Sequence, residues 1–447
     1  MTATQQFVPG PQQADALESI TAWYRDDSPY AQQIYRLFGY AGTGKTTLAR
    51  HVVNALGLSN VCYAAYTGKA AHVMRTRGGC DGAGTIHSLI YQPLGADDTE
   101  LRRLVGELEE LDRNPADYGP DEFAARRDDL VAAIAAEQRK PRSLQFTLRA
   151  ESELADADLL ILDEASMVND EMAQDLLSFG VKILVLGDPA QLPPVSGEGF
   201  FTNAIPDSLL TQVHRVASEN SPIIRIATSI RESQAGDLAV GLSGSDGNCG
   251  RFRGVRNMLA YHQVICGTNR TRWELINKIR ALEGRYGPKP VPGDRIIILA
   301  NSKDAGCFNG QQFTVLGCEV DPDSKGEKYM LRVHDDEGLE RDLRVWAEGF
   351  INLKGEQSVK FSGRGLTAAA TFAHAITTHK AQGSEWPNVL VVDESSVFRS
   401  MKAKSLSGKA PPQQVAELAH ADARRWLYTA VTRASDRVSV VLPGAVR

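Results

Sequence analysis

Residues 39–46, GYAGTGKT, contain the full pattern G-x-x-x-x-G-K-[ST]. The apolar run QIYRLF precedes this segment and the helical pattern TTLARHVVNAL follows it, which is the strand–loop–helix context that a phosphate-binding loop requires. Glycines in such a loop let backbone N–H groups approach phosphates, and the start of the helix adds a favourable dipole. We expect Lys45 to reach the β and γ phosphates of a nucleotide and Thr46 to bind Mg²⁺. The residues expected to line the phosphate site are Gly39, Gly42, Thr43, Gly44, Lys45, Thr46 and Thr47.

A second apolar run, LLILDEAS (159–166), ends in two carboxylates. Ligands of open α/β sheets bind at the carboxyl ends of the strands, so both acids are expected beside the phosphate loop. Asp163 is suited to hold Mg²⁺ through water, and Glu164 to act as the general base for the attacking water. The alternative is a helix N-cap with a first-turn charge, but the phosphate loop upstream favours the catalytic interpretation.

The stretch VKILVLGDPAQLPPV (181–195) predicts a third strand that ends at the same edge. Gln191 is a neutral donor and acceptor, suited to contact a γ-phosphate or the attacking water. Pro193 and Pro194 stop strand pairing and produce a stiff, extended exit, which could carry a small change at the phosphate to a distant surface. A proline-rich turn with a solvated glutamine is the alternative, and this stretch alone does not exclude it.

Two later arginines could complete a site for phosphoryl transfer. Arg433 lies in YTAVTRAS (428–435), on a predicted helix, and Arg215 lies in LLTQVHR (209–215). An arginine that reaches across a cleft stabilises the charge of the transition state. A single arginine is more often a surface charge. The proposed role of these two residues in phosphoryl transfer therefore depends on the sequence motifs around them.

Strand and helix patterns alternate around these motifs, which predicts doubly wound parallel sheets. A second alternating region begins near residue 205 and resumes at FAHAITTHKAQG, NVLVVDES and ARRWLYTAVTRA. Between its two parts, residues 292–350 contain four strand patterns separated by turns, which predicts a small β domain. Residues 91–142 instead have charged, helically spaced residues, with 8 Lys/Arg and 13 Asp/Glu, a local balance of 8 − 13 = −5. A solvated helical insertion is favoured there, and a module that touches a partner is the alternative.

The composition is that of a soluble protein with two or three domains, with 447 residues, 43% hydrophobic and 23% charged. Most of the net charge of −6 comes from the acidic segment, so basic grooves elsewhere can still bind nucleic acid. The six cysteines are scattered without a CxxC pair, which favours reduced thiols over a zinc site or disulfides. The start of the chain lacks a secretory pattern and no apolar run is long enough for a membrane helix. We expect a cytoplasmic protein, in a bacterial or phage-infected host cytosol, with no membrane partner.

In order along the chain, these strings resemble the superfamily 1 DNA helicases of the RecD-like and Dda-like group. PQQADAL resembles the motif whose glutamine recognises adenine, with Gln13 better spaced than Gln12. GYAGTGKTT, LDEASM and LGDPAQLPPV resemble motifs I, II and III, and LLTQVHR, ITTHKAQGSEW and LYTAVTRA resemble motifs IV, V and VI. The resemblance covers nearly the whole chain. Tyr66 and Ala381 depart from the usual proline and serine of motifs Ia and V, for which we expect altered fit rather than lost activity.

The resemblance implies two RecA-like domains, with ATP and Mg²⁺ between them and single-stranded DNA across their top. The implied domains are a first RecA-like domain (1–90 and 143–204), a charged helical insertion (91–142), a second RecA-like domain (205–290 and 366–447) and an SH3-like β domain (291–365). Relatives usually carry a β-hairpin pin in place of the insertion. Further nucleotide contacts are implied at Gln13, Gly383, Glu385 and Arg433. DNA contacts are implied at Thr67, Lys69, Thr85, His87, Asn269, Thr377, His379 and Lys380, where short hydroxyls and amides can hold phosphates without recognising sequence.

The expected function is that of an ATP-dependent DNA helicase that moves 5′ to 3′. The alternatives are a translocase that displaces proteins without unwinding and a nucleotide-dependent DNA-binding scaffold. The catalytic set Lys45, Asp163, Glu164, Gln191 and Arg433 argues against a scaffold, which does not need all of them. The expected partners are single-stranded DNA, single-strand/duplex junctions, and replication or recombination proteins, with the chain acting as a monomer.

Overall fold

The computed structural model describes residues 8–76, 78–93, 103–104, 107–108, 111, 123, 126–127, 129–131, 133, 146–149, 151–193, 199–202, 204–212, 221–233, 249–252, 257–302, 305–335, 338–361 and 367–443. The chain divides into two units. Residues 1–86 and 153–447 form the larger unit, and residues 87–152 form the smaller one. Three sheets of the larger unit position every described candidate residue except His87.

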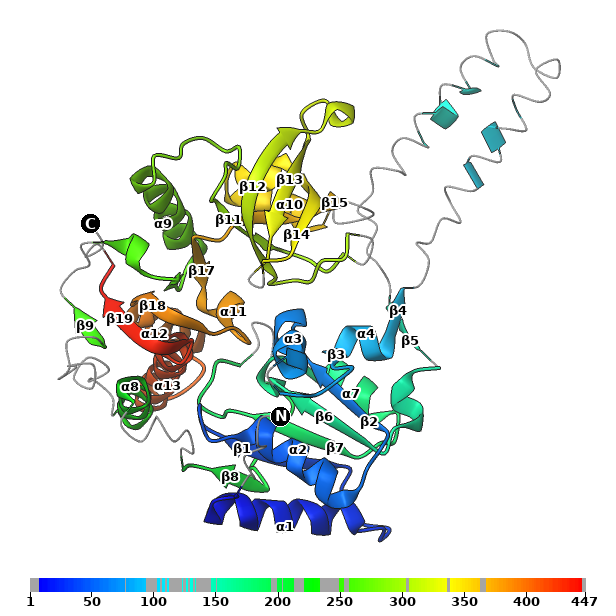
Figure 1. Ribbon diagram of the computed structural model, residues 1–447, viewed down its shortest axis with the longest axis vertical. Helices are drawn as coiled ribbons and strands as arrows, with labels where there is room; N and C mark the ends of the chain where they lie inside the picture. Colours follow the sequence, from blue (N-terminus) through cyan, green and yellow to red (C-terminus); the bar gives the residue numbers. More distant parts are fainter. Residues whose placement is uncertain are drawn as a thin grey trace, which may run out of the picture. The chain divides into compact units, whose positions relative to one another are not determined.

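The first sheet has the strand order β3-β2-β6-β7-β1-β8, and all neighbouring strands run parallel (Figure 1). Its strands are β1 (Ile34–Gly39), β2 (Val61–Ala65), β3 (Gly84–Thr85), β6 (Leu159–Asp163), β7 (Ile183–Gly187) and β8 (Ser208–Leu210). The helices of this part are α1 (Pro11–Arg25), α2 (Lys45–Leu56), α3 (Gly68–Thr76) and α7 (Asp170–Leu177), with 3₁₀ helices η2 (Glu153–Asp156) and η3 (Ala165–Met167). Because the strands are parallel, β1, β6 and β7 deliver the phosphate loop, the acid pair and motif III to one edge.

The phosphate loop requires glycine at two positions for different reasons. A Cβ atom on Gly39 would lie 2.5 Å from Thr43 Oγ1 and 2.9 Å from Leu210 Cβ, so there is no room for a side chain. Gly44 adopts the left-handed conformation with φ 80° immediately before α2 begins at Lys45. Glycine reaches this conformation without the steric penalty of other residues. The loop therefore turns sharply enough to place the first N–H groups of α2 at its centre.

The second sheet is also parallel, with the strand order β17-β10-β18-β19-β9. Its strands are β9 (Gly250–Phe252), β10 (Gln263–Cys266), β17 (Ala375–Thr377), β18 (Trp386–Val392) and β19 (Ala434–Val441). The helices of this part are α8 (Pro222–Glu232), α9 (Asn269–Leu282), α11 (Thr378–Ala381), α12 (Ser395–Leu406) and α13 (Pro412–Val431), with η5 (Met258–Ala260). Val264 and Cys266 pack into one core and Ile265 into another. Both faces of the sheet are thus covered, as parallel sheets require, and the predicted parallel α/β core is confirmed.

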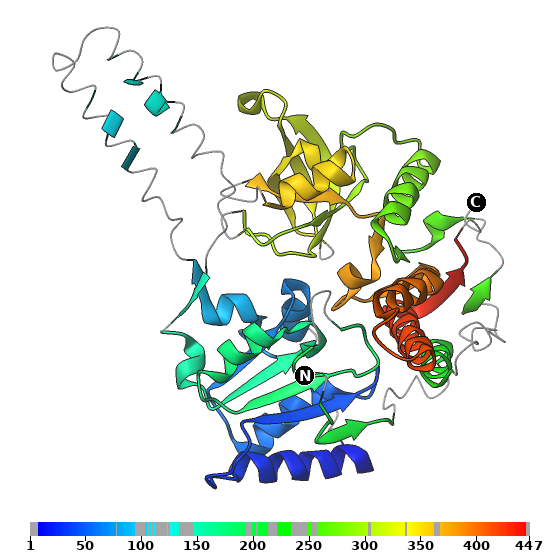
Figure 2. The ribbon, with the colours of Figure 1, turned by 180° about the vertical axis from the view of Figure 1, so that it is seen from behind.

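The third sheet lies between α9 and β17 in the sequence, with the strand order β15-β14-β13-β12-β11-β16 (yellow-green to orange in Figures 1 and 2). Its strands are β11 (Arg295–Ile298), β12 (Gln312–Val320), β13 (Lys328–His334), β14 (Glu340–Trp346), β15 (Thr367–Ala368) and β16 (Ala370–Phe372), with η6 (Pro322–Ser324), η7 (Ala347–Phe350) and α10 (Leu353–Phe361). Neighbours are antiparallel except β14 and β15. Phe313 and Val345 of this sheet share one core with Val264 of the second sheet.

A buried ionic cluster joins the points where the chain enters and leaves the third sheet. Asp294 precedes β11 and is fully buried, and His374 follows β16. Arg280 of α9 donates from Nε to Asp294 Oδ1 and from Nη2 to Oδ2, both at 3.0 Å. His374 Nε2 lies 3.3 Å from Asp294 Oδ1. Burial lowers the pKa of His374, so the neutral imidazole can act as a further donor to the carboxylate.

Replacing Asp294 by asparagine is expected to lower the free energy of unfolding by roughly 3 kcal/mol, because Arg280 would keep a buried charge without its counter-ion. Thermal or denaturant unfolding measures this loss. The matched control is Arg332→Gln, which breaks an exposed ion pair with Glu340 and is expected to cost under about 1 kcal/mol. Equal losses in the two variants would contradict the assignment of the Asp294 cluster as a structural joint.

Helix α4 (Ile86–Ile90) begins at the last residue of the larger unit and continues in the smaller unit. The smaller unit also contains a two-stranded antiparallel sheet of β4 (Tyr91–Pro93) and β5 (Phe146–Leu148). Residues 91–93 are therefore strand, where the sequence predicted the start of a helical insertion. Most of the predicted helical insertion lies outside the described residues. Within the described part of the chain, no helix combines the length and the apolar character needed to cross a membrane.

Candidate active site

The phosphate loop is held in shape by its own lysine and by the first helix. Lys45 Nζ donates to the backbone oxygens of Gly39 at 2.6 Å and of Tyr40 at 3.2 Å, so the ammonium lies across the loop. Gln13 is buried, and its Nε2 donates to Thr43 O at 3.1 Å. Gln12 instead binds the backbone N–H groups that follow β8. The structure therefore places Gln13, rather than Gln12, against the phosphate loop.

The acid pair lies at the end of β6, beside the first turn of α2. Thr46 Oγ1 donates to Asp163 Oδ2 at 3.0 Å, and the backbone N–H of Glu164 donates to Asp163 Oδ1 at 2.8 Å. Glu164 adopts a left-handed backbone with φ 51°, which costs a residue with a side chain about 1–2 kcal/mol. Such strain is often found at functional sites. Desolvation raises the pKa of Glu164, while Arg433 and Lys45 act against that rise.

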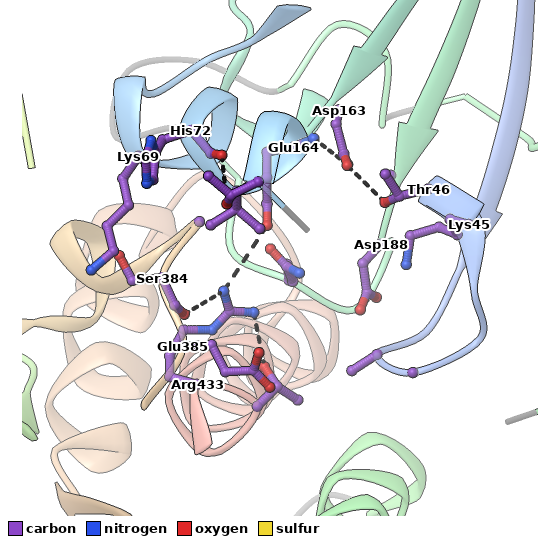
Figure 3. A pocket seen from close by; sticks show the side chains of 18 residues that line it. Lys45, Thr46, Lys69, His72, Asp163, Glu164, Asp188, Ser384, Glu385 and Arg433 are labelled. Atoms are coloured by element: carbon purple, nitrogen blue, oxygen red, sulfur yellow. Dashed lines mark hydrogen bonds and ion pairs between the residues drawn. The ribbon is translucent and has the colours of Figure 1, made fainter. Parts of the chain in front are cut away.

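Arg433 comes from the second sheet and reaches the acid pair of the first. Its Nη1 lies 4.0 Å from Glu164 Oε1 and also donates to Ser384 O at 3.3 Å. Its Nε donates to Thr429 O at 3.1 Å, and the side chain is 8% exposed. Arg433 lies in the turn between α13 and β19, so the prediction that it lies on a helix is wrong. Figure 3 shows its guanidinium pointing toward Glu164. The two parallel sheets thus contribute opposite charges, from Glu164 and Arg433, to one cavity of ≈ 460 Å³.

Motif III lines the same cavity with Asp188 and Gln191. Asp188 is buried, and desolvation raises the pKa of its carboxyl, while Lys45 acts against that rise. Gln191 has a buried Oε1 atom that has no partner among the described residues. A buried amide oxygen without a partner is expensive, so Gln191 is suited to a group that enters the cavity. Pro194 and Arg215 lie outside the described residues.

The remaining predicted nucleotide contacts lie around the mouth of the cavity. Gly383 and Glu385 line it from the second sheet. A Cβ atom on Gly383 would lie 3.0 Å from Thr67 Oγ1, so this glycine permits a close approach between the two parallel-sheet regions. Gly42, with φ 81°, also lines the cavity, and Thr43 is fully buried behind it. Thr47 lines an adjoining cavity with Gln13.

The predicted DNA contacts of the first sheet follow the carboxyl ends of β2 and β3. Thr67 Oγ1 accepts from Ala70 N at 3.1 Å and so caps the start of α3. Lys69 Nζ lies 5.0 Å from the ring centre of Trp386, a cation–π contact with the second sheet that the sequence did not indicate. Thr85 ends β3 and is 7% exposed. His87 belongs to the smaller unit, where burial lowers the pKa of its imidazole.

The predicted DNA contacts of the second sheet follow the carboxyl ends of two paired strands, β10 and β17. Thr377 caps α11 by accepting from Lys380 N at 3.5 Å. Asn269 Oδ1 accepts from Arg272 Nε at 3.2 Å. Lys380 Nζ lies 3.4 Å from Glu356 Oε1 of α10. Burial lowers the pKa of His379. The structure therefore brings these four residues to one edge.

Two residues of the site were missed at the level of sequence. Glu356 accepts from Arg272 and from Trp273 Nε1 at 3.1 Å as well as facing Lys380, but nothing around it in the sequence indicates a role. Tyr428 binds groups of the first sheet, and its place five residues before Arg433 in LYTAVTRA was the available signal.

A phosphate loop, an acid pair and an arginine from a second parallel sheet define a P-loop nucleotide-binding protein. The chain belongs to the AAA domain family, whose sequence pattern matches residues 10–248. The pattern of the UvrD-like helicase C-terminal domain matches residues 372–405.

Within that class the chain is similar to the RecD-like and Dda-like helicases, which confirms the resemblance seen in the sequence. It is 28% identical over 435 residues to the ATP-dependent RecD2 DNA helicase of Deinococcus radiodurans, covering 90% of this chain and 46% of that protein. It is 28% identical over 209 residues to the ATP-dependent DNA helicase dda of Enterobacteria phage T4, covering 44% of this chain and 37% of that protein. The chain therefore spans less than half the length of these curated relatives.

Solved structures agree on the fold. The structure of Bacteroides Pif1 bound to ssDNA matches with a TM-score of 0.52 at 17% identity, over 97% of this chain and 92% of that chain. The structure of Bacteroides Pif1 in complex with ADP-AlF3 and ssDNA gives 0.52 at 19% identity over the same shares.

Proposed function

We propose that the chain is an ATP-dependent DNA helicase that moves 5′ to 3′ along single-stranded DNA and unwinds duplex DNA. The observation that carries this proposal is the approach of Arg433, from the second parallel sheet, to Glu164 beside the phosphate loop of the first, at 4.0 Å. An arginine held across a cleft from the general base makes hydrolysis depend on the relative position of the two sheets. The named relatives are helicases that use ATP.

The residues present fit ATP and Mg²⁺. The glycine loop and the N-terminus of α2 offer backbone N–H groups to the phosphates. Thr46 and Asp163, joined at 3.0 Å, supply the hydroxyl and carboxylate that Mg²⁺ prefers. Gln191 offers a buried amide oxygen with no partner among the described residues. When bound, Mg²⁺ neutralises phosphate charge and orients the γ-phosphoryl group.

The proposed roles follow from these positions. Glu164 accepts a proton from the attacking water, and Gln191 orients that water or the γ-phosphate. Lys45 and Arg433 stabilise the charge that develops on the phosphoryl oxygens. Arg215 is proposed as a second arginine by its motif alone. Gln13 and Glu385 are proposed to contact the nucleoside part, on opposite sides of the cleft.

The proposed DNA track runs over the carboxyl ends of β2 and β3 in the first sheet and of β10 and β17 in the second. Hydroxyls, amides and single cations at these ends can hold phosphates without recognising bases. The third sheet is proposed to be the SH3-like domain of this family. Residues 91–142 are proposed as the insertion that replaces the pin, with the β4–β5 pair at its base. A cytosolic location, a monomeric state and a role in replication, recombination or repair are further proposals.

Unwinding is the part of the proposal that most needs a test, because a translocase could share this whole site. Partial duplexes with a 5′ or a 3′ single-stranded tail are compared for strand separation with ATP and Mg²⁺. We expect the 5′-tailed substrate to be unwound several times faster. Displacement of a bound protein from single-stranded DNA without strand separation would favour the translocase. An ATPase rate that does not rise with single-stranded DNA would favour the scaffold.

A further inference from the structure

Tyr428 belongs to the core of the second sheet, but its hydroxyl binds the first. The residue is 1% exposed, and its ring packs among the apolar residues that α13 contributes to that core. Tyr428 Oη accepts from the backbone N–H of Ala41 at 3.2 Å and donates to Asp188 Oδ2 at 2.8 Å. One hydroxyl therefore joins α13 to both the phosphate loop and motif III.

Motif III is held by α13 at a second point. The backbone N–H of Leu192 donates to Thr429 Oγ1 at 2.9 Å, and Gln382 Nε2 donates to Leu192 O at 3.1 Å. Leu192 is 3% exposed, and its side chain packs in the core of the second sheet. Asp188 and Leu192 lie on either side of Gln191 in the sequence. The path of the backbone through Gln191 is therefore fixed at both ends by the second sheet.

Asp188 depends on these donors because it is a buried carboxylate. Its Oδ1 atom accepts from Ala190 N at 3.0 Å within its own loop, and Tyr428 donates to its other oxygen, Oδ2. A buried carboxylate that loses a donor is destabilised or shifts to a new partner. The ammonium of Lys45 and the guanidinium of Arg433 also act on this carboxyl, and both are proposed to act on the phosphates.

We infer that Tyr428 is a positioning residue for ATP hydrolysis: its hydroxyl, held by Ala41 and Asp188, sets the position of motif III relative to the phosphate loop when the two sheets close. This inference rests on the proposed function. Thr429 follows Tyr428 at the end of α13, and Arg433 lies in the turn just after that helix. Closure therefore brings the hydroxyl, the Leu192 contact and the arginine into place together. Gln191 and Arg433 are then aligned by one movement of α13.

The variant Tyr428→Phe removes the hydroxyl and leaves the ring in the core. We expect the DNA-stimulated kcat for ATP hydrolysis to fall about tenfold, which corresponds to the loss of one hydrogen bond to a charged group. The KM for ATP is expected to change less than about twofold, because the hydroxyl acts on alignment rather than on nucleotide contacts. The assay uses the full chain, ATP with Mg²⁺, and an oligo-dT single strand.

Tyr35→Phe is the matched control. The hydroxyl of Tyr35 also has two partners, Ser19 Oγ at 2.8 Å and Ser208 Oγ at 2.6 Å, and the residue is 4% exposed. All three residues belong to the first sheet and its helix α1. We expect this control to lower the unfolding temperature and to leave kcat unchanged.

Asp188→Asn supplies a second variant of the same contact. It is expected to lower kcat with little change in KM, and the double variant with Tyr428→Phe is expected to lose less than the product of the two single losses. Full additivity, or a Tyr428→Phe enzyme that keeps kcat within twofold while its unfolding temperature falls like that of the control, would overturn the inference. A wild-type protein without any ATPase activity would overturn the proposed function instead.

Discussion

Replacing Arg433 by alanine is expected to lower the rate of DNA-stimulated ATP hydrolysis by roughly 10³-fold or more, the loss typical of a missing arginine finger. The guanidinium is aimed at the acid pair, and the backbone oxygens of Ser384 and Thr429 hold it there. Little rearrangement is therefore needed when charge develops on the γ-phosphoryl group. Steady-state ATPase assays measure the loss, and nucleotide binding is expected to persist.

Two further variants distinguish an effect on catalysis from an effect on folding. Arg433→Lys keeps the positive charge but loses the planar fork, so we expect only partial recovery of the rate. Arg425→Ala removes an exposed arginine of α13, the helix that precedes Arg433, and is expected to leave the rate unchanged. A variant without its arginine finger is expected to keep about a thousandth of the wild-type rate or less. If Arg433→Ala kept more than about a tenth of that rate, the finger would have to come from another residue, with Arg215 as the first candidate.

Replacing Glu164 by glutamine is expected to lower the hydrolysis rate by about 10²- to 10⁴-fold, the range for the loss of a general base. The change is isosteric and leaves in place the hydrogen bond between Thr46 and Asp163, the two proposed Mg²⁺ ligands. Because ATP still binds, the variant is expected to remain on single-stranded DNA in the nucleotide-bound state. Single-turnover hydrolysis and an equilibrium DNA-binding titration measure the two effects.

Glu171→Gln is the control for this variant, since Glu171 is an exposed acid in the first turn of α7. It is expected to hydrolyse ATP at the wild-type rate. A Glu164→Gln protein with a nearly unchanged rate would remove Glu164 from the role of base, and Asp188, a buried acid of the same cavity, would take its place as the candidate.

The parallel core could be predicted because its signals are local. Each strand that carries catalytic residues is a short apolar run followed by polar groups, and the phosphate loop requires a strand before it and a helix after it. Residues 91–93 could not be predicted as strand, because three residues show no period and their pairing with β5 is set far along the chain. The ionic cluster of Asp294, Arg280 and His374 was missed for a similar reason.

Within the candidate site, the sequence indicated which residues carry chemistry but not which of them touch. Lys45, Thr46 and Asp163 follow from motif spacing. The contact of Lys69 with Trp386, and that of Tyr428 with Asp188, depend on how the two parallel sheets face each other. No spacing rule encodes that. The preference for Gln13 over Gln12 rests on the resemblance, and the structure adds that Gln13 of α1 donates to the backbone of the phosphate loop.

The junction at Asp294 and His374 also bears on how the chain folds. Because β11 and β16 are hydrogen-bonded neighbours, the third sheet begins and ends at almost the same point in space. The entropy of closing the long segment between β10 and β17 is therefore offset within the third sheet itself, by contacts that form inside the segment. Once the third sheet has formed, the connection that must be closed for β10 to pair with β17 is effectively short. Length changes at the tips of the third sheet are thereby separated from the assembly of the two parallel sheets.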